Sequence, residues 1–218
     1  MASLVPADVA PGVASSARRR AYWLKTLYQW HWLSSAACLV ALVAFAATGF
    51  TLNHPSLIEA SPKVTKRAAV LPAGRLATLR ALRPGRDAPL PVDVVDWLAT
   101  EFGVHAQARD GEWSDREVFV ALPGPGVDAG VTIALDDGAV QYEASDRGWI
   151  AYFNDLHKGR NTGAAWRWFI DVFAFACLVF ALTGLCLLYL HGRSRAATWP
   201  MVGLGVVLPL LLALLFVH

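Results

Sequence analysis

Long stretches without charged residues dominate the pattern of polar and apolar positions along the chain. No Asp, Glu, Lys or Arg occurs in the 33 residues between Lys25 and Glu59, in the 21 residues between Asp171 and Arg193, or in the last 23 residues. A helix needs about 20 apolar residues to cross the roughly 30 Å of hydrocarbon in a bilayer. The pattern therefore predicts three transmembrane helices, at 31–54, 172–191 and 198–218.

Basic residues beside these stretches indicate the orientation of the chain. Three consecutive arginines at 18–20 precede the first span, and the loop 192–197 contains Arg193 and Arg195 but no acidic residue. Short basic flanks stay in the cytoplasm, so we expect 1–30 and 192–197 to be cytoplasmic segments. The long segment between the first two spans then lies outside. A cleaved signal peptide is the competing interpretation, but its apolar core has only about 7–15 residues, so we favour an uncleaved anchor.

The segment between the first two spans has two parts of different character. Residues 55–91 are rich in Pro, Ala and Arg and show no clear period, which indicates a linker with one short helix. Residues 92–148 indicate a small α+β module, and residues 149–171 a juxtamembrane segment. The expected elements of the module are an amphipathic helix at 92–102 ending at Gly103, strands at 117–122, 131–135 and 139–142, and a turn at 136–138.

Composition excludes several classes of protein. The chain is 56% hydrophobic and 17% charged, whereas a soluble domain has about 45–50% apolar and about 25% charged residues. All three cysteines lie within the apolar stretches, which excludes a secreted disulfide scaffold. The net charge of +2 gives no reason to expect a nucleic acid partner. The partner that composition does imply is the lipid bilayer.

Four of the six histidines stand at the ends of the first two spans. His31 and His54 are 23 residues apart, which is about 34 Å along a helix, so they cannot share one centre. The second span is antiparallel to the first and is flanked by His157 and His191. We therefore expect two pairs, His31 with His191 on the cytoplasmic side and His54 with His157 outside.

Two facing imidazoles can hold the iron of a b-type haem, and an ionisable residue at a membrane span is a functional candidate by default. We expect haem b as the cofactor, with His31, His54, His157 and His191 as the iron ligands. Two haems and one haem both fit this pattern. Interfacial histidines whose ring tips reach water are the competing interpretation.

Neighbouring residues also fit a haem site. Gly49 and Gly184 each follow a threonine, and a glycine lets a second helix or a flat macrocycle approach the backbone closely. Simple helix packing explains the same glycines equally well. Lys158 and Arg160 follow the outer His157 and would pair with the anionic haem propionates, unless they only extend toward the bilayer interface. No catalytic residue is identified.

The segment at 149–166 reads WIAYFNDLHKGRNTGAAW, and the first span begins at His31 and ends in TGFTLNH at His54. Both resemble the PepSY-associated transmembrane family. The module is similar to a PepSY domain, with DDGAV at 136–140 in place of the usual Asp-x-x-x-Gly turn. The resemblance covers roughly residues 22–190, and Leu-His-Lys-Gly-Arg is its most specific part.

The resemblance implies a bacterial inner-membrane protein with a periplasmic module, which binds haem and passes electrons to a periplasmic acceptor. That acceptor would be a ferric siderophore or a flavoprotein, and the donor a quinol or a cytoplasmic reductant. The resemblance supports His31, His54 and His157 as ligands, whereas His191 rests on the topology. Larger relatives have four or more spans, so a single chain, a homodimer and a complex with another subunit stay open.

Other function classes receive less support. A transmembrane oxidoreductase of the ferric-chelate reductase type, or an electron-transfer subunit, is the reading we favour. A non-redox, membrane-anchored PepSY protein with a binding or regulatory role is the alternative. A peptidase is not supported, because the chain lacks His-Glu-x-x-His, Gly-x-Ser-x-Gly and a cysteine outside the spans. It also lacks a nucleotide-binding glycine motif, so NAD(P)H is not expected to bind directly.

Overall fold

The computed structural model describes residues 11–58, 61–82, 87–107, 109–192 and 195–217. The chain divides into two compact units. The first contains residues 1–43 and 169–218, and the second contains residues 44–168.

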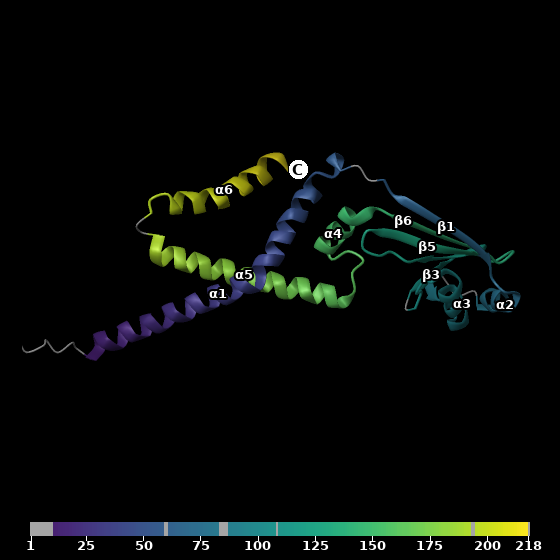
Figure 1. Cartoon of the computed structure of the whole chain (residues 1–218), viewed down its shortest axis with the longest axis horizontal. Helices are drawn as coiled ribbons and strands as arrows, with labels where there is room; N and C mark the ends of the chain where they lie inside the picture. The colour runs from purple at the N-terminus through teal and green to yellow at the C-terminus, as the bar shows by residue number, and fades with distance from the viewer. Residues whose placement is uncertain (1–10, 59–60, 83–86, 108, 193–194, 218) are drawn as a thin grey trace, which may run out of the picture. The chain divides into compact units, whose positions relative to one another are not determined.

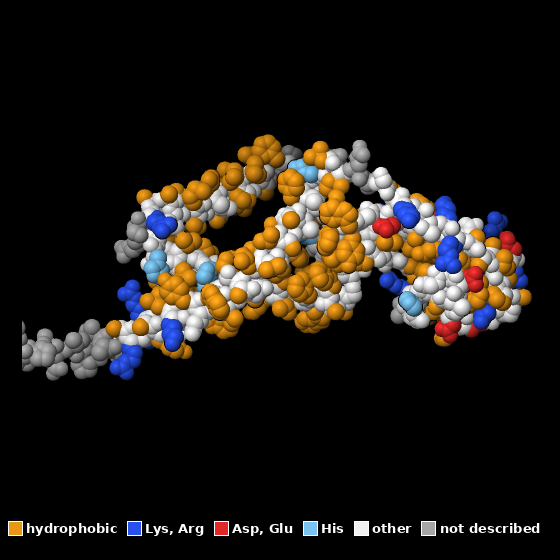
Figure 2. Space-filling view, viewed as in Figure 1, with side chains coloured by type: hydrophobic (Ala, Val, Ile, Leu, Met, Phe, Trp, Pro, Cys, Tyr) orange, Lys and Arg blue, Asp and Glu red, His pale blue; other side chains and the backbone are white. Residues whose placement is uncertain are grey.

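Three helices are long and apolar enough to cross a membrane: α1 (Pro11–Asn53), α5 (Ala164–His191) and α6 (Thr198–Phe216) (Figure 1). Apolar side chains line all three on their surfaces (Figure 2). The prediction of three spans, with a module between the first two, is confirmed. Both α1 and α5 begin earlier than the expected 31 and 172, because a charge-free stretch marks only the part of a helix that can lie in hydrocarbon. Alanine, arginine and lysine continue a helix readily beyond that stretch.

The module between α1 and α5 is built on a six-stranded antiparallel sheet in the order β1-β6-β5-β4-β3-β2. Its strands are β1 (Lys63–Val70), β2 (Asp87–Pro89), β3 (Asp110–Trp113), β4 (Glu117–Ala121), β5 (Val127–Ala134) and β6 (Ala139–Asp146). Its helices are η1 (Pro55–Leu57), α2 (Ala73–Leu82), α3 (Val92–Phe102) and α4 (Gly148–Lys158).

The core of the module lies between the sheet and the helices α2 and α3. Alternate residues of β4 are buried, as expected for a sheet with one covered face. They pack with the apolar faces of the two helices in a single cluster. The largest fully buried side chains of this cluster are Leu71, Leu79, Leu98, Ile133, Val94, Val118, Val120, Val131 and Val140.

The assignment of residues 55–91 as a linker was wrong, because this segment contributes β1, α2 and β2 to the module. Strand β1 pairs with β6 over its whole length, from Lys63 opposite Asp146 to Val70 opposite Ala139. It is an edge strand with almost every residue exposed. An edge strand without a buried face shows no alternation of polar and apolar residues, so the hydrophobic pattern could not reveal it.

The remaining predicted elements of the module are confirmed, with shifted limits. Helix α3 covers 92–102 and ends at Gly103, whose φ of 71° is the left-handed conformation typical of a helix end. Gly138 has a φ of 75° in the predicted turn. Strand β5 begins four residues earlier than expected and β6 ends four later. The short, charged strand β3 was not predicted.

Candidate functional site

His31 of α1 is held by three residues of α5. Its Nδ1 lies 3.0 Å from Oγ1 of Thr183. Its ring stacks on Phe180, with 4.8 Å between ring centroids and 16° between planes. A Cβ added to Gly184 would lie 3.3 Å from Cε1 of His31, so the absent side chain leaves the space that the imidazole needs. We call Phe180, Thr183, Gly184 and His31 the His31 clasp.

His157, near the end of α4, is held in the same way by α1. Its Nδ1 lies 2.6 Å from Oγ1 of Thr48. Its ring contacts Phe45, with 4.7 Å between centroids and 36° between planes. A Cβ on Gly49 would lie 3.8 Å from Cε1 of His157. We call Phe45, Thr48, Gly49 and His157 the His157 clasp.

The two clasps come from one sequence pattern, Phe-Ala-x-Thr-Gly, at 45–49 and at 180–184. Residues three and four positions after the phenylalanine lie on the same helix face, so all three contacts reach one imidazole. Sequence analysis identified the Thr-Gly pairs but not the two phenylalanines, nor the role of the hydroxyls. The repeat was the available signal, since it occurs on the two spans that carry the candidate ligands.

The threonine hydroxyls also indicate which ring nitrogen carries the proton. Thr48 Oγ1 lies 3.0 Å from the carbonyl oxygen of Ala44, and Thr183 Oγ1 lies 2.7 Å from that of Val179. A hydroxyl has one hydrogen and can accept through its lone pairs. A hydroxyl that donates to the helix carbonyl accepts from Nδ1–H of the histidine. This network therefore favours imidazoles protonated at Nδ1, with the lone pair on Nε2.

The other two candidate ligands have the same arrangement at Nδ1. His54 donates from Nδ1 to the carbonyl oxygen of Phe50 at 3.0 Å, and His191 donates to that of Leu187 at 3.1 Å. A carbonyl oxygen only accepts, so Nδ1 carries the proton in both rings. Nε2 of His191 lies 3.3 Å from the hydroxyl of Tyr28.

Within each unit the predicted partners lie near the same helix segment. Tyr28, which contacts His191, is three residues before His31 on α1. His157 packs on residues 45–49 of α1, and His54 follows the last residue of that helix. Among the described residues, no hydrogen bond or ring contact joins the two histidines of either pair. The pairing of His31 with His191 and of His54 with His157 stays a prediction.

A buried carboxylate holds α4, and with it His157, against the sheet. Asp155 is only 3% exposed. It accepts hydrogen bonds from the backbone N–H of Gly126 at 2.9 Å and from Nη2 of Arg147 at 2.8 Å. Gly126 has a φ of 69°, and a Cβ there would come within 2.8 Å of the backbone of Tyr152. Only a glycine at position 126 therefore lets the turn before β5 pack against helix α4.

Helix α4 also contacts the end of α1 one turn before His157. Oγ1 of Thr51 donates to Oδ1 of Asn154 at 2.6 Å. Together with the Asp155 contacts, this bond fixes the position of α4 on both sides. Neither Asn154 nor Asp155 was predicted as part of the site, although both stand within the Asn-Asp-Leu-His stretch that ends at His157.

The two predicted propionate partners have different surroundings. Nη2 of Arg160 lies 3.8 Å from the carboxylate of Asp128, an exposed ion pair. Lys158 is exposed at the end of α4, directly before Gly159, which closes the helix with a φ of 64°. Both follow His157 closely, and their role toward a cofactor stays a prediction.

Comparison with known families gives one match. The model of the family described as Putative PepSY_TM-like matches residues 22–218, which include all three spans and the module. No match was found among curated proteins or among solved structures.

Proposed function

Since the chain belongs to the PepSY_TM-like family, we propose that it is a b-type haem protein that passes electrons across a bacterial inner membrane. The acceptor would be a periplasmic ferric siderophore or flavoprotein, and the donor a quinol or a cytoplasmic reductant. In this proposal the N-terminus is cytoplasmic and the sheet module periplasmic.

The contact of an oxygen atom with Nδ1 in each of the four histidines is the observation that carries the proposal. Each of His31, His54, His157 and His191 has its Nδ1 against an oxygen atom. Histidines that bind metals usually donate their other ring N–H to an oxygen, which fixes the tautomer and orients the ligating nitrogen. The chain thus supplies four imidazoles whose Nε2 lone pairs are suited to iron.

The donor set favours haem over a bare metal ion. Structural and catalytic zinc sites need three or four protein ligands, and the described residues contain no group of three or more His, Cys, Asp or Glu side chains that could hold an ion. A haem supplies four nitrogen ligands itself and needs only axial residues from the protein. If the predicted pairs form, two histidines at each site would be a sufficient set for haem and an insufficient one for zinc.

Each residue of the clasps has a definite task in this proposal. Thr48 and Thr183 hold the proton at Nδ1, and Phe45 and Phe180 fix the planes of the imidazoles. Gly49 and Gly184 leave room for the histidine rings, since the imidazoles are their nearest side-chain neighbours. Lys158 and Arg160 would neutralise the propionates. A bound haem would supply one-electron transfer, with its potential set by the axial ligands and burial.

The proposal is tested with the full-length protein purified from cells supplied with haem. We expect a Soret band that shifts on reduction with dithionite. His31→Ala and His157→Ala should each lose part of the haem and keep the rest, whereas the control His105→Ala, at a histidine of the module that belongs to neither clasp, should keep all of it. Full haem content in both clasp variants would contradict the proposed ligands, whereas wild-type protein without haem would favour a non-redox membrane anchor.

A further inference from the structure

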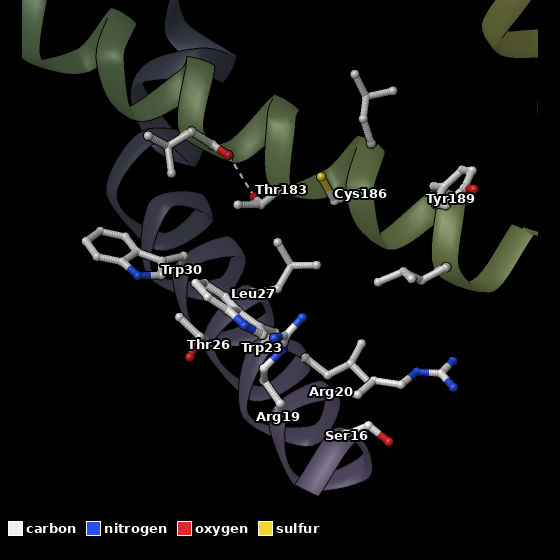
Figure 3. Close-up of a pocket in the computed structure, with 14 residues that line it drawn as sticks. Ser16, Arg19, Arg20, Trp23, Thr26, Leu27, Trp30, Thr183, Cys186 and Tyr189 are labelled. Atoms are coloured by element: carbon white, nitrogen blue, oxygen red, sulfur yellow. Dashed lines mark hydrogen bonds between the residues drawn. The ribbon is translucent and has the colours of Figure 1, made fainter. Parts of the chain in front are cut away.

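A groove lies between the first half of α1 and the second half of α5, within a single unit (Figure 3). Its volume is about 1130 Å³. Trp23, Leu27 and Trp30 line it from α1, and Cys186 and Tyr189 from α5, so its walls are mainly apolar and aromatic.

Arg19 and Arg20 make one end of the groove cationic. Both are exposed, and among the described residues neither has an acidic partner within ion-pair distance. The only acidic residue in the described part of this unit is Asp171, which lies 19 residues before Leu190, about 28 Å along α5. Within the described residues of this unit, no acidic side chain therefore lies where it could complement these two arginines.

The length of the groove matches that of a lipid acyl chain in a bilayer. Because α1 and α5 are antiparallel along the groove, Arg20 lies toward the end with Tyr189 and Leu190, and Trp30 toward the end with Val179 and Thr183. Ten residues separate Arg20 from Trp30, which is about 15 Å along a helix. Half of the hydrocarbon thickness of a bilayer is also about 15 Å. The groove is thus long enough to hold one acyl chain along its length.

We propose that this groove is a binding site for an anionic phospholipid. Guanidinium groups bind phosphate oxygens in a bidentate fashion, so Arg19 and Arg20 hold the headgroup. Tryptophan and tyrosine rings favour the headgroup depth, where Trp23 and Tyr189 stand beside the arginines. One acyl chain lies along Leu24 and Leu27 toward Trp30. The site is independent of haem, since it requires neither clasp.

The lining residues favour phospholipid over the other membrane molecules of suitable size. A quinone carries no charge and would gain little from two arginines. A haem requires a ligating nitrogen, and no histidine lines the groove. The groove does share Thr183 with the His31 clasp, so the far end of the bound acyl chain packs beside the residue that holds His31.

The test is native mass spectrometry of the full-length protein from nanodiscs that contain equal amounts of phosphatidylglycerol and phosphatidylcholine. We expect the wild-type protein to retain phosphatidylglycerol in preference to phosphatidylcholine. Arg19→Gln and Arg20→Gln should each retain about fivefold less phosphatidylglycerol, because one basic residue near a lipid surface has an effect of this size. The matched control is Arg18→Gln, which removes the same charge from an adjacent exposed residue that does not line the groove. Leu27→Trp, which fills the groove, should also reduce retention.

Several results would overturn the proposal. An equal loss for Arg18→Gln would mean that surface charge in general attracts the lipid. Equal retention of both lipids by the wild type, or no loss in the Arg19 and Arg20 variants, would exclude a selective headgroup site. Retention of a quinone instead of lipid would assign the groove to that molecule, and loss of haem from Arg19→Gln would assign it to a propionate.

Discussion

Oγ1 of Thr48 lies 2.6 Å from Nδ1 of His157, although 109 residues separate the two in the chain. Thr183 and His31 repeat the contact at 3.0 Å across a separation of 152 residues. In each case a membrane helix supplies the hydroxyl and another helix supplies the imidazole. The repeated contact indicates that the fold maintains the orientation of these two imidazoles.

Replacing the threonines should change the potential of a bound haem. Thr183→Val keeps the shape but removes the acceptor of the His31 Nδ1 proton, which makes the imidazole a weaker donor to iron and favours the reduced state. A hydrogen bond of about 0.5–1.5 kcal/mol corresponds to a rise of about 20–60 mV in one midpoint potential. Thr48→Val should do the same for the His157 site. Redox titration followed in the visible spectrum measures both.

The serine variants are the control for this prediction. Thr183→Ser and Thr48→Ser keep the hydroxyl and should leave the potentials close to those of the wild type. Equal shifts in the valine and serine variants would show that the lost methyl group, and not the hydrogen bond, is responsible.

The two clasp glycines should differ in their tolerance of a side chain. In Gly184→Ala the new Cβ would lie 3.3 Å from Cε1 of His31, tighter than ordinary contact, so the ring must shift on its stack with Phe180. In Gly49→Ala the corresponding distance to His157 is 3.8 Å, an ordinary van der Waals contact. We expect Gly184→Ala to lose haem and Gly49→Ala to retain it, measured as absorbance per chain. Similar losses in both variants would contradict the proposed seating of the rings.

Removing the buried carboxylate should loosen α4 from the sheet. Asp155→Ala leaves the guanidinium of Arg147 without its closest partner and Gly126 N–H without an acceptor. Breaking a buried ion pair costs about 3 kcal/mol. Where local opening limits the hydrogen exchange of backbone amides, this cost corresponds to an exchange rate that is about a hundredfold higher. Hydrogen exchange with mass spectrometry of α4 and β5 measures this effect.

The control for Asp155 is the other carboxylate near Arg147. Asp128 is about half exposed, and its contact with Nε of Arg147 is 3.2 Å. An exposed ion pair contributes about 0–1 kcal/mol to stability. Asp128→Asn should therefore change the hydrogen exchange rate of α4 and β5 by less than about fivefold. A larger effect for Asp128→Asn than for Asp155→Ala would contradict the role given to Asp155.

Tyr28 tests the assignment of His191. The tyrosine hydroxyl lies 3.3 Å from Nε2 of His191, the nitrogen that would bind iron. A ligating His191 must give up this weak contact when haem binds, so Tyr28→Phe should keep the haem of the wild type. His191→Ala should lose the haem of the proposed His31–His191 site. Unchanged haem in His191→Ala, measured by absorbance per chain, would remove His191 from the ligand set.

The sequence was informative where one physical pattern dominates. Charge-free stretches longer than a bilayer is thick define α1, α5 and α6, and a short apolar run that ends at Pro123 and Gly124 defines β4. It was uninformative for β1, whose exposed residues leave no period. The partners of the histidines were also hidden, because a contact such as Thr48 with His157 depends on how α4 returns to α1, which no local pattern encodes.

The central claim is that the histidine sites hold haem, and the haem content of the purified wild-type protein tests it most directly. A pyridine haemochrome assay on full-length protein from haem-supplied cells should give about two haem b per chain, one for each pair of histidines. One haem per chain would restrict the claim to a single site. Colourless protein that is folded and intact would contradict it.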